Sequence, residues 1–128
     1  MGTNGTKRIL IVDDEPGFLL ALRKILLGPG LDIDTAGTLE EAMALLRTHT
    51  YQVVIADIRL TMILQEEGIE ILQYVKKERP ASKVIMISGY GNDAAMEKIR
   101  TLGADLFFEK PVSSDILKNT LRCWGILC

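Results

Sequence analysis

Four apolar runs in this sequence end on polar side chains that can take part in chemistry. These side chains are, in chain order, Asp13 with Asp14, then Asp57, Ser88 and Lys110. Carboxylates accept phosphoryl groups in covalent catalysis, a serine hydroxyl can donate to a phosphoryl oxygen, and a lysine can neutralise its charge. Asp57 follows the apolar run 53–56, which is typical of a strand buried on both faces. We therefore interpret Asp57 as a phosphoryl-accepting nucleophile.

The three aspartates also predict a metal site, provided that the fold brings them together. Two carboxylates about 4 Å apart repel by roughly 4 kcal/mol at an effective dielectric constant of about 20, so protons or a cation must compensate. Oxygen ligands favour Mg²⁺, and no histidine or cysteine stands near these positions in the sequence to recruit zinc. Together with Lys110, Mg²⁺ would shield and orient a phosphoryl group. Mg²⁺ is therefore the expected cofactor.

The alternation of apolar runs with segments of helical period predicts an α/β fold. We expect one parallel sheet with helices on both faces. Expected strands are 9–12, 31–36, 51–56, 84–87 and 106–108, and expected helices are 15–27, 39–49, 66–78, 92–102 and about ten residues after Ser113 or Ser114. In such a sheet, ligands bind outside the carboxyl ends of the strands. All the polar side chains named above would lie at that edge.

Local signals support several of these boundaries. Pro16 suits the first turn of a helix, and Gly28-Pro29-Gly30 ends that helix. Thr38 and Glu41 have the spacing of a capping box. The strand 31–36, with Ile33 between two aspartates, has the pattern expected near a sheet edge.

Length and composition restrict the class of protein. The 128 residues suit one domain, with a flexible segment at 1–6, the domain at 7–122 and a tail at 123–128. A net charge of -2 gives no electrostatic basis for direct nucleic-acid binding. Two cysteines are too few for a disulfide framework, which favours the cytoplasm. No apolar run approaches the roughly 20 residues of a membrane span, and no signal peptide is recognisable.

These motifs resemble those of the receiver domains of two-component response regulators. The matching residues are Val12-Asp13-Asp14-Glu15-Pro16, Asp57, Ser88-Gly89, Gly103-Ala104-Asp105 and Phe107-Phe108-Glu109-Lys110-Pro111. The likeness covers about residues 7–122. It implies a flavodoxin-like, doubly wound (βα)5 fold with strand order 2-1-3-4-5.

The resemblance also implies a function. Asp57 would take a phosphoryl group from a sensor histidine kinase, and Lys110 would contact the resulting acyl phosphate. Asp14, Asp57 and the carbonyl of Arg59 would hold Mg²⁺, with Asp13 acting through water. Such a domain is not an enzyme beyond its own phosphotransfer and autodephosphorylation.

Ser88 and Phe107 would form the switch that this resemblance implies. Ser88 would move toward the phosphoryl group while Phe107 rotates inward, remodelling the face of the fourth helix, fifth strand and fifth helix. That face would control an output domain or a partner protein outside this chain, and it would also suit a homodimer. We expect a receiver excised from the N-terminus of a longer protein rather than a stand-alone regulator.

Two departures from the family pattern stand out. Leu60-Thr61 replaces the usual methionine-proline pair after the acceptor, and Gly68 stands eleven residues beyond Asp57, so the loop from Arg59 is about three residues longer. Phe107 replaces the commoner tyrosine.

Three alternatives remain open at this point. The first is a receiver-like binding module that acts without phosphorylation. The second is a phosphohydrolase of the haloacid dehalogenase type, but Arg59 stands where its acid/base aspartate would be. The third is a flavin-binding protein, whose phosphate loop the acidic run 13–15 would repel.

Overall fold

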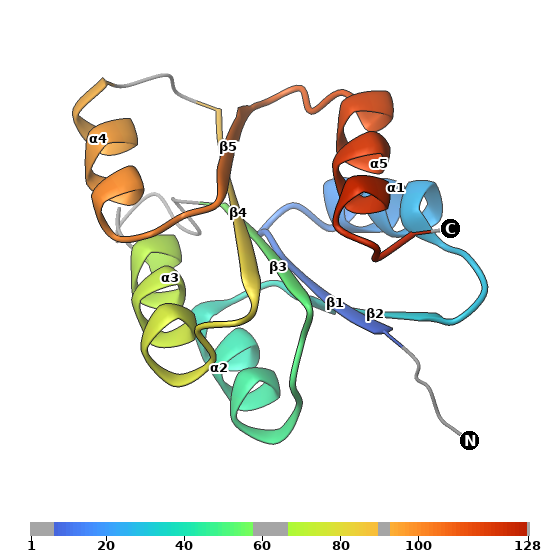
Figure 1. Cartoon of the computed structure of the whole chain (residues 1–128), viewed down its shortest axis with the longest axis horizontal. Coiled ribbons are helices and arrows are strands. Elements are labelled where there is room, and N and C mark those ends of the chain that lie inside the picture. Colours follow the sequence, from blue (N-terminus) through green and yellow to red (C-terminus); the bar gives the residue numbers. More distant parts are fainter. Residues whose placement is uncertain (1–6, 58–66, 90–92, 128) are drawn as a thin grey trace.

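The computed structural model describes residues 7–57, 67–89 and 93–127, in which five strands alternate with five helices (Figure 1). The strands are β1 (Lys7–Val12), β2 (Leu31–Ala36), β3 (Val53–Asp57), β4 (Lys83–Ser88) and β5 (Leu106–Glu109). The helices are α1 (Pro16–Leu26), α2 (Leu39–Thr48), α3 (Glu67–Glu78), α4 (Asp93–Thr101) and α5 (Ser114–Cys123). All strand pairs are parallel, and their order β2-β1-β3-β4-β5 confirms the predicted topology.

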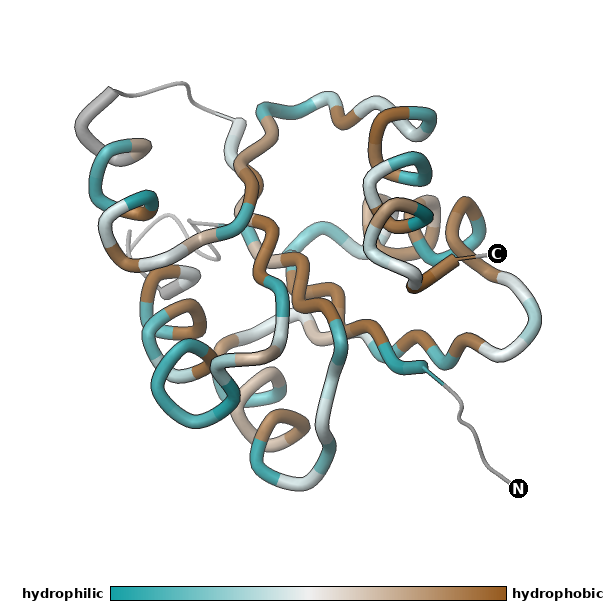
Figure 2. Tube along the Cα trace, in the orientation of Figure 1, coloured by the Kyte–Doolittle hydropathy of each residue, from teal (hydrophilic) through white to brown (hydrophobic). Residues whose placement is uncertain are grey.

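The sheet separates two hydrophobic cores because successive strand residues point to opposite faces. On β1, Leu10 and Val12 pack with α2, α3 and α4, whereas Ile9 and Ile11 pack with α1 and α5. Figure 1 shows these two groups of helices on opposite sides of the sheet. The central strands are hydrophobic along most of their length (Figure 2), as burial on both faces requires.

The helix starts follow the local signals in the sequence. Pro16 occupies the first turn of α1, so the observed helix is one residue shorter at each end than the predicted range 15–27. Thr38 caps α2 by accepting a hydrogen bond from the Glu41 N–H at 3.1 Å. The Glu41 carboxylate accepts from the N–H of Gly37 at 2.7 Å, one residue before the cap. Thr38 and Glu41 therefore satisfy two backbone donors at this helix start.

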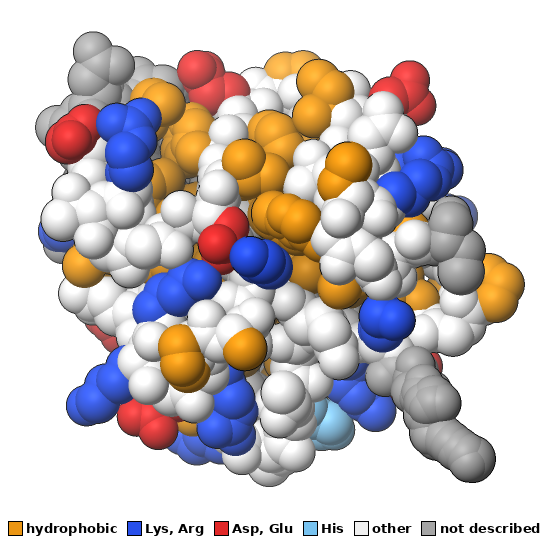
Figure 3. All heavy atoms as spheres, in the orientation of Figure 1, with side chains coloured by type: hydrophobic (Ala, Val, Ile, Leu, Met, Phe, Trp, Pro, Cys, Tyr) orange, Lys and Arg blue, Asp and Glu red, His pale blue; other side chains and the backbone are white. Residues whose placement is uncertain are grey.

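β2 and β5 are the two edge strands of the sheet. β2 lies at one edge, as its Asp-Ile-Asp pattern predicts, and β5 at the other. Beyond α5, the side chains of Trp124, Ile126 and Leu127 pack on the core shared by α1 and α5. On the face shown in Figure 3, hydrophobic side chains gather on both sides of β5, toward α4 and toward α5.

None of the helices in the described part of the chain is long and apolar enough to cross a membrane.

Candidate functional site

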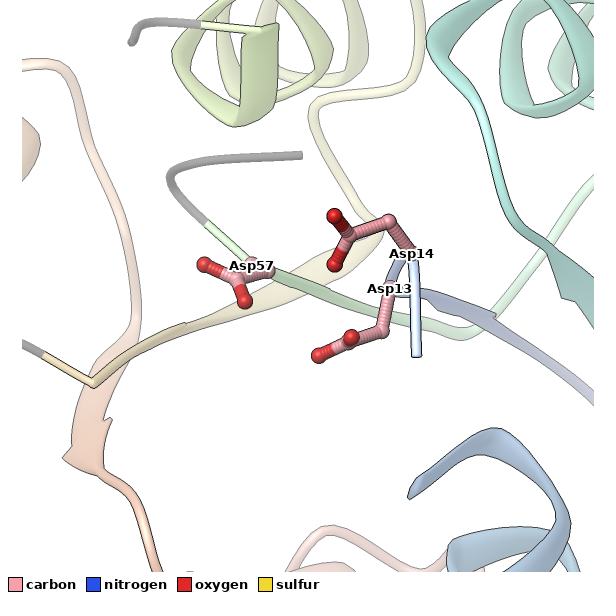
Figure 4. Close-up of side chains that lie close together, drawn as sticks. All are labelled: Asp13, Asp14 and Asp57. Atoms are coloured by element: carbon pink, nitrogen blue, oxygen red, sulfur yellow. The ribbon is translucent and has the colours of Figure 1, made fainter. Parts of the chain in front are cut away.

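The ends of β1 and β3 bring three aspartates together. Val12 pairs with Ala56 in the sheet, so the next residues, Asp13 directly after β1 and Asp57 at the end of β3, lie at the same level. Asp14 follows on the exposed side. One carboxylate oxygen from each of the three lies within 4.8 Å of the others. Figure 4 shows the side chains of Asp13 and Asp14 projecting toward the side of Asp57, which confirms that the three aspartates meet at one edge.

Asp13 is held rigidly although it is charged and has no exposed surface. Its N–H donates to the carbonyl of Ala36 at 3.0 Å, and its Oδ1 accepts from the N–H of Glu15 at 2.9 Å. These bonds fix the turn from β1 into α1. Among the described residues, no donor is aligned for a hydrogen bond with the buried Oδ2, although the Lys110 ammonium lies 2.7 Å away.

Lys110 reaches this group of acids from the end of β5. The backbone N–H of Lys110 donates to the carbonyl of Ser88 at 2.9 Å, which extends the pairing of β4 with β5 up to the lysine. The peptide bond between Lys110 and Pro111 is cis. The ammonium contacts Asp13 at 2.7 Å, Glu15 at 2.8 Å and Asp57 at 3.1 Å. One cation therefore serves three carboxylates from two strand ends.

The electrostatics of the site reflect this crowding. Burial alone would lower the pKa of Lys110, but its contacts with Asp13, Glu15 and Asp57 outweigh burial and raise the pKa above its usual value. The hydrogen bond from Lys110 lowers the pKa of the Glu15 carboxyl. Burial, followed by the adjacent Asp13 charge, raises the pKa of Asp14. Lysine thus stays charged, while the acids at this edge are incompletely neutralised.

The residues present are suited to a divalent cation. Four carboxylates, counting Glu15, face one ammonium, and the Oδ2 of Asp13 is buried without an aligned donor. Because the carboxylates outnumber the cations among the described residues at this edge, a further cation there would be favourable. The oxygen-only donor set matches Mg²⁺ better than zinc.

Comparison with known proteins identifies the fold and the family. The sequence model of the response regulator receiver domain matches residues 9–122. The chain belongs to this family. Asp13 and Asp57 therefore lie in the acidic pocket of a receiver domain, and the family agrees with the resemblance seen in the sequence.

Similar sequences occur in longer regulatory proteins. The chain is 37% identical over 110 residues to the nitrogen assimilation regulatory protein NtrX of Azorhizobium caulinodans, covering 85% of this chain and 24% of that protein. It is 34% identical to the response regulator protein PilR of Pseudomonas aeruginosa, covering 88% and 25%. It spans 63% of the length of the regulator RegA from Rhodobacter capsulatus, to which it is 24% identical over 93% of its own residues.

Solved structures agree with the fold. A CheY-like receiver domain from Methanospirillum hungatei superposes with a TM-score of 0.85 and 32% identity, covering 94% of each chain. The receiver domain of NtrC4, determined as a beryllofluoride-activated dimer, superposes with a TM-score of 0.79 and 32% identity, covering 91% of this chain and 93% of that one.

The remaining predicted residues take distinct places in this receiver. Ser88 is the last residue of β4 and is buried at the same edge as the acids. Phe107 lies opposite Met86 in the sheet and packs on the core beneath α2, α3 and α4 instead of at the acidic edge. Arg59, the expected carbonyl ligand, lies outside the described residues, as does most of the loop that follows Asp57.

Sequence reasoning missed two neighbours of the lysine. In the sequence, Glu15 belongs to the acidic motif, and Phe18 is an apolar residue inside the predicted helix 15–27. In the structure Glu15 pairs with Lys110, and the ammonium lies 4.5 Å from the centroid of the Phe18 ring. A third consecutive acid after β1 was a usable signal for Glu15. Nothing in the local pattern of Phe18 distinguished it from a core residue.

Proposed function

We propose that this receiver domain accepts one phosphoryl group on Asp57 in a Mg²⁺-dependent reaction and thereby switches a surface that controls an output domain or partner. The observation that supports this most is the position of Asp57. Its side chain is 8% exposed, its carboxylate shares a small volume with Asp13 and Asp14, and the Lys110 ammonium lies 3.1 Å away. An acid buried only for structural reasons needs no such excess of neighbouring acids.

In the proposed transfer, a carboxylate oxygen of Asp57 attacks the phosphorus atom of a phosphorylated donor. The new oxygen–phosphorus bond forms as the bond from phosphorus to the donor breaks, and the donor leaves with that electron pair. With a phosphohistidine donor, the leaving imidazole nitrogen takes a proton from solvent. Lys110 stays close to Asp57 and offers a donor to the phosphoryl oxygens, whose charge it offsets.

The metal would be held by the side chains of Asp14 and Asp57, with Asp13 acting through water and Arg59 through its carbonyl. Mg²⁺ supplies charge neutralisation and orientation of the phosphoryl oxygens when it is bound. Asp13 is anchored by its bonds to Ala36 and Glu15, so its Oδ2, which lies 2.7 Å from the Lys110 ammonium, is held toward the site without further reorganisation.

The switch would run from Ser88 to Phe107. The two residues belong to the neighbouring strands β4 and β5. Ser88 lies at the acidic edge opposite Glu109, and Phe107 lies two residues before Glu109, on the core. A hollow of about 290 Å³ between α4 and β5 is lined by Phe107, Ile99, Ala104 and others. Movement of Ser88 toward a phosphoryl group would be accompanied by inward rotation of Phe107, which changes this surface.

A sensor histidine kinase is the proposed donor, because the family of this chain is that of response regulators. The chain spans about a quarter of NtrX and PilR, which supports an output domain or effector beyond the receiver. Dimerisation through α4, β5 and α5, autodephosphorylation and a cytoplasmic location complete the proposal.

Phosphoryl uptake tests it. The chain is incubated with acetyl phosphate and Mg²⁺, and intact mass is measured against the Asp57→Asn variant and against a sample with chelator. We expect one phosphoryl group on the wild-type chain in Mg²⁺ and none in either control. Absence of uptake by the wild type would favour instead the receiver-like module that acts without phosphorylation.

A further inference from the structure

One side of the Lys110 ammonium is occupied by an aromatic ring. The Phe18 side chain, from the first turn of α1, places its ring centroid 4.5 Å from the Lys110 Nζ. The carboxylates of Asp13, Glu15 and Asp57 make the other contacts of this ammonium. We propose that Phe18 is a positioning residue for phosphoryl transfer, which holds Lys110 at the acidic edge through the face of its ring. The inference rests on the proposed function of Asp57.

The carboxylate contacts cannot all persist during the reaction. Lys110 has three N–H donors, and in the resting structure three carboxylates lie around them. A phosphoryl group on Asp57 needs at least one of those donors, so one carboxylate contact must be exchanged. The Glu15 side chain is 65% exposed and can be hydrated when it loses the lysine, which makes this contact the easiest to give up.

The ring contact does not depend on this exchange. The electrostatic attraction between a cation and an aromatic face comes from the ring itself and involves none of the three donors. It therefore does not depend on which oxygens accept those donors. Among the described contacts of the ammonium, the one with Phe18 is the attraction that uses no oxygen acceptor.

A cavity beside the ring explains why such a hold is needed. A hollow of about 510 Å³ lies between α1 and the segment after β5, and its lining includes Phe18, Leu22, Ile25, Lys110 and Val112. Phe18, Leu22 and Ile25 share one face of α1 because they are four and three residues apart. Since Lys110 itself lines this hollow, a flexible lysine has room there. Loss of the ring would give the ammonium a second position away from Asp57.

Two substitutions of Phe18 distinguish the effect of the aromatic face from the effect of apolar side-chain volume. Phe18→Leu keeps an apolar side chain and removes the aromatic face, whereas Phe18→Tyr keeps the face. We expect uptake from acetyl phosphate in Mg²⁺ to be about five- to tenfold slower in Phe18→Leu and within about twofold of wild type in Phe18→Tyr. Leu20→Ala, at a position 55% exposed on the same helix, serves as a matched control and should leave the rate unchanged.

A nuclear magnetic resonance measurement tests the geometry without phosphorylation. The ammonium protons of Lys110, assigned by their disappearance in Lys110→Arg, should be shifted upfield of the other lysines by the ring current. That shift should vanish in Phe18→Leu and remain in Phe18→Tyr. A wild-type Lys110 signal at the position of the other lysines would overturn the inference, even if the leucine variant fails to fold.

The kinetic outcomes distinguish the two proposals. Uptake by the wild type with an equal rate in Phe18→Leu would overturn the role of Phe18 alone. Equal slowing in the leucine and tyrosine variants would also overturn it, because the ring would then not matter. A wild-type chain that takes up no phosphoryl group would overturn the proposed function, and with it any role of Phe18 in transfer.

Discussion

Acidic side chains are balanced by cations at the amino end of the sheet, whereas they outnumber the cations among the described residues at its carboxyl end. At the amino end, Arg8 lies 3.5 Å from Asp32 and 3.3 Å from Asp34, and the Tyr51 hydroxyl donates to Asp34 at 2.7 Å. Each of these acids has a cation beside it. At the carboxyl end, by contrast, a single cation among the described residues, Lys110, is paired with three carboxylates.

A second group at the amino end shows the same balance. Asp105 accepts from the Lys76 ammonium and from the N–H of Val84, both at 2.8 Å, and Lys83 lies 3.9 Å from its other oxygen. This carboxylate joins the end of α3 to the starts of β4 and β5. Balanced charges at one end stabilise the fold, whereas the excess of acids at the other end costs stability and provides a site for a cation and a phosphoryl group.

The largest effect expected from this contrast is at Asp105. Asp105→Ala leaves the N–H of Val84 without its acceptor and the Lys76 ammonium with only the carbonyl of Ser82, 3.0 Å away, so we expect the free energy of unfolding to fall by about 2–3 kcal/mol. Urea denaturation measures it. The matched control is Glu97→Ala, which removes an exposed pair with Arg100 and should cost less than about 0.5 kcal/mol. Equal losses in the two variants would remove the distinction between Asp105 and a surface pair.

The carboxyl end should respond to metal instead. At ten times its dissociation constant, Mg²⁺ should stabilise the folded chain by about 1.4 kcal/mol, because it binds the acidic pocket only when the pocket is formed. Thermal unfolding with and without chelator measures this. Asp57→Asn should lose most of the response, and Asp32→Asn, at the other end, should keep it. An equal Mg²⁺ response in both variants would contradict a site at Asp57.

A smaller effect is expected at Tyr51. Tyr51→Phe removes the hydrogen bond to Asp34 and should lower stability by about 1 kcal/mol at pH 7. Burial, followed by the hydrogen bond to Asp34, raises the pKa of Tyr51 above its ordinary 10.0. The folded state therefore retains the phenolic proton more tightly, so wild type loses stability as pH rises above about 10 and the phenylalanine variant lacks this contribution. Urea denaturation from pH 8 to 11 should show the difference shrinking, and a constant difference would contradict the assignment.

Most of the fold could be predicted because its signals are local. Buried parallel strands read as apolar runs, and Pro16, Thr38 and Ser113 each mark a helix start that the structure confirms. The meeting of Asp13, Asp14 and Asp57 also followed from sequence, since parallel strands must end at one edge. The family resemblance supplied the strand order, which periodicity alone does not specify.

The contacts of Lys110 with Glu15 and Phe18 could not be predicted in the same way. They join the turn after β1 and α1 to the segment after β5, and they depend on how closely the helix packs against that segment. An exposed glutamate and an apolar helical residue have many ordinary explanations in a sequence. Only tertiary packing shows that both are directed at one ammonium.

Locating the phosphoryl group tests the central claim most directly. After treatment with acetyl phosphate and Mg²⁺, proteolysis and fragment mass analysis would identify the modified side chain. Our account predicts one phosphoryl group, carried by Asp57 and absent from the Asp57→Asn variant. Modification that persists in that variant, or that maps to Asp13, Asp14 or Ser88 in the wild type, would contradict it.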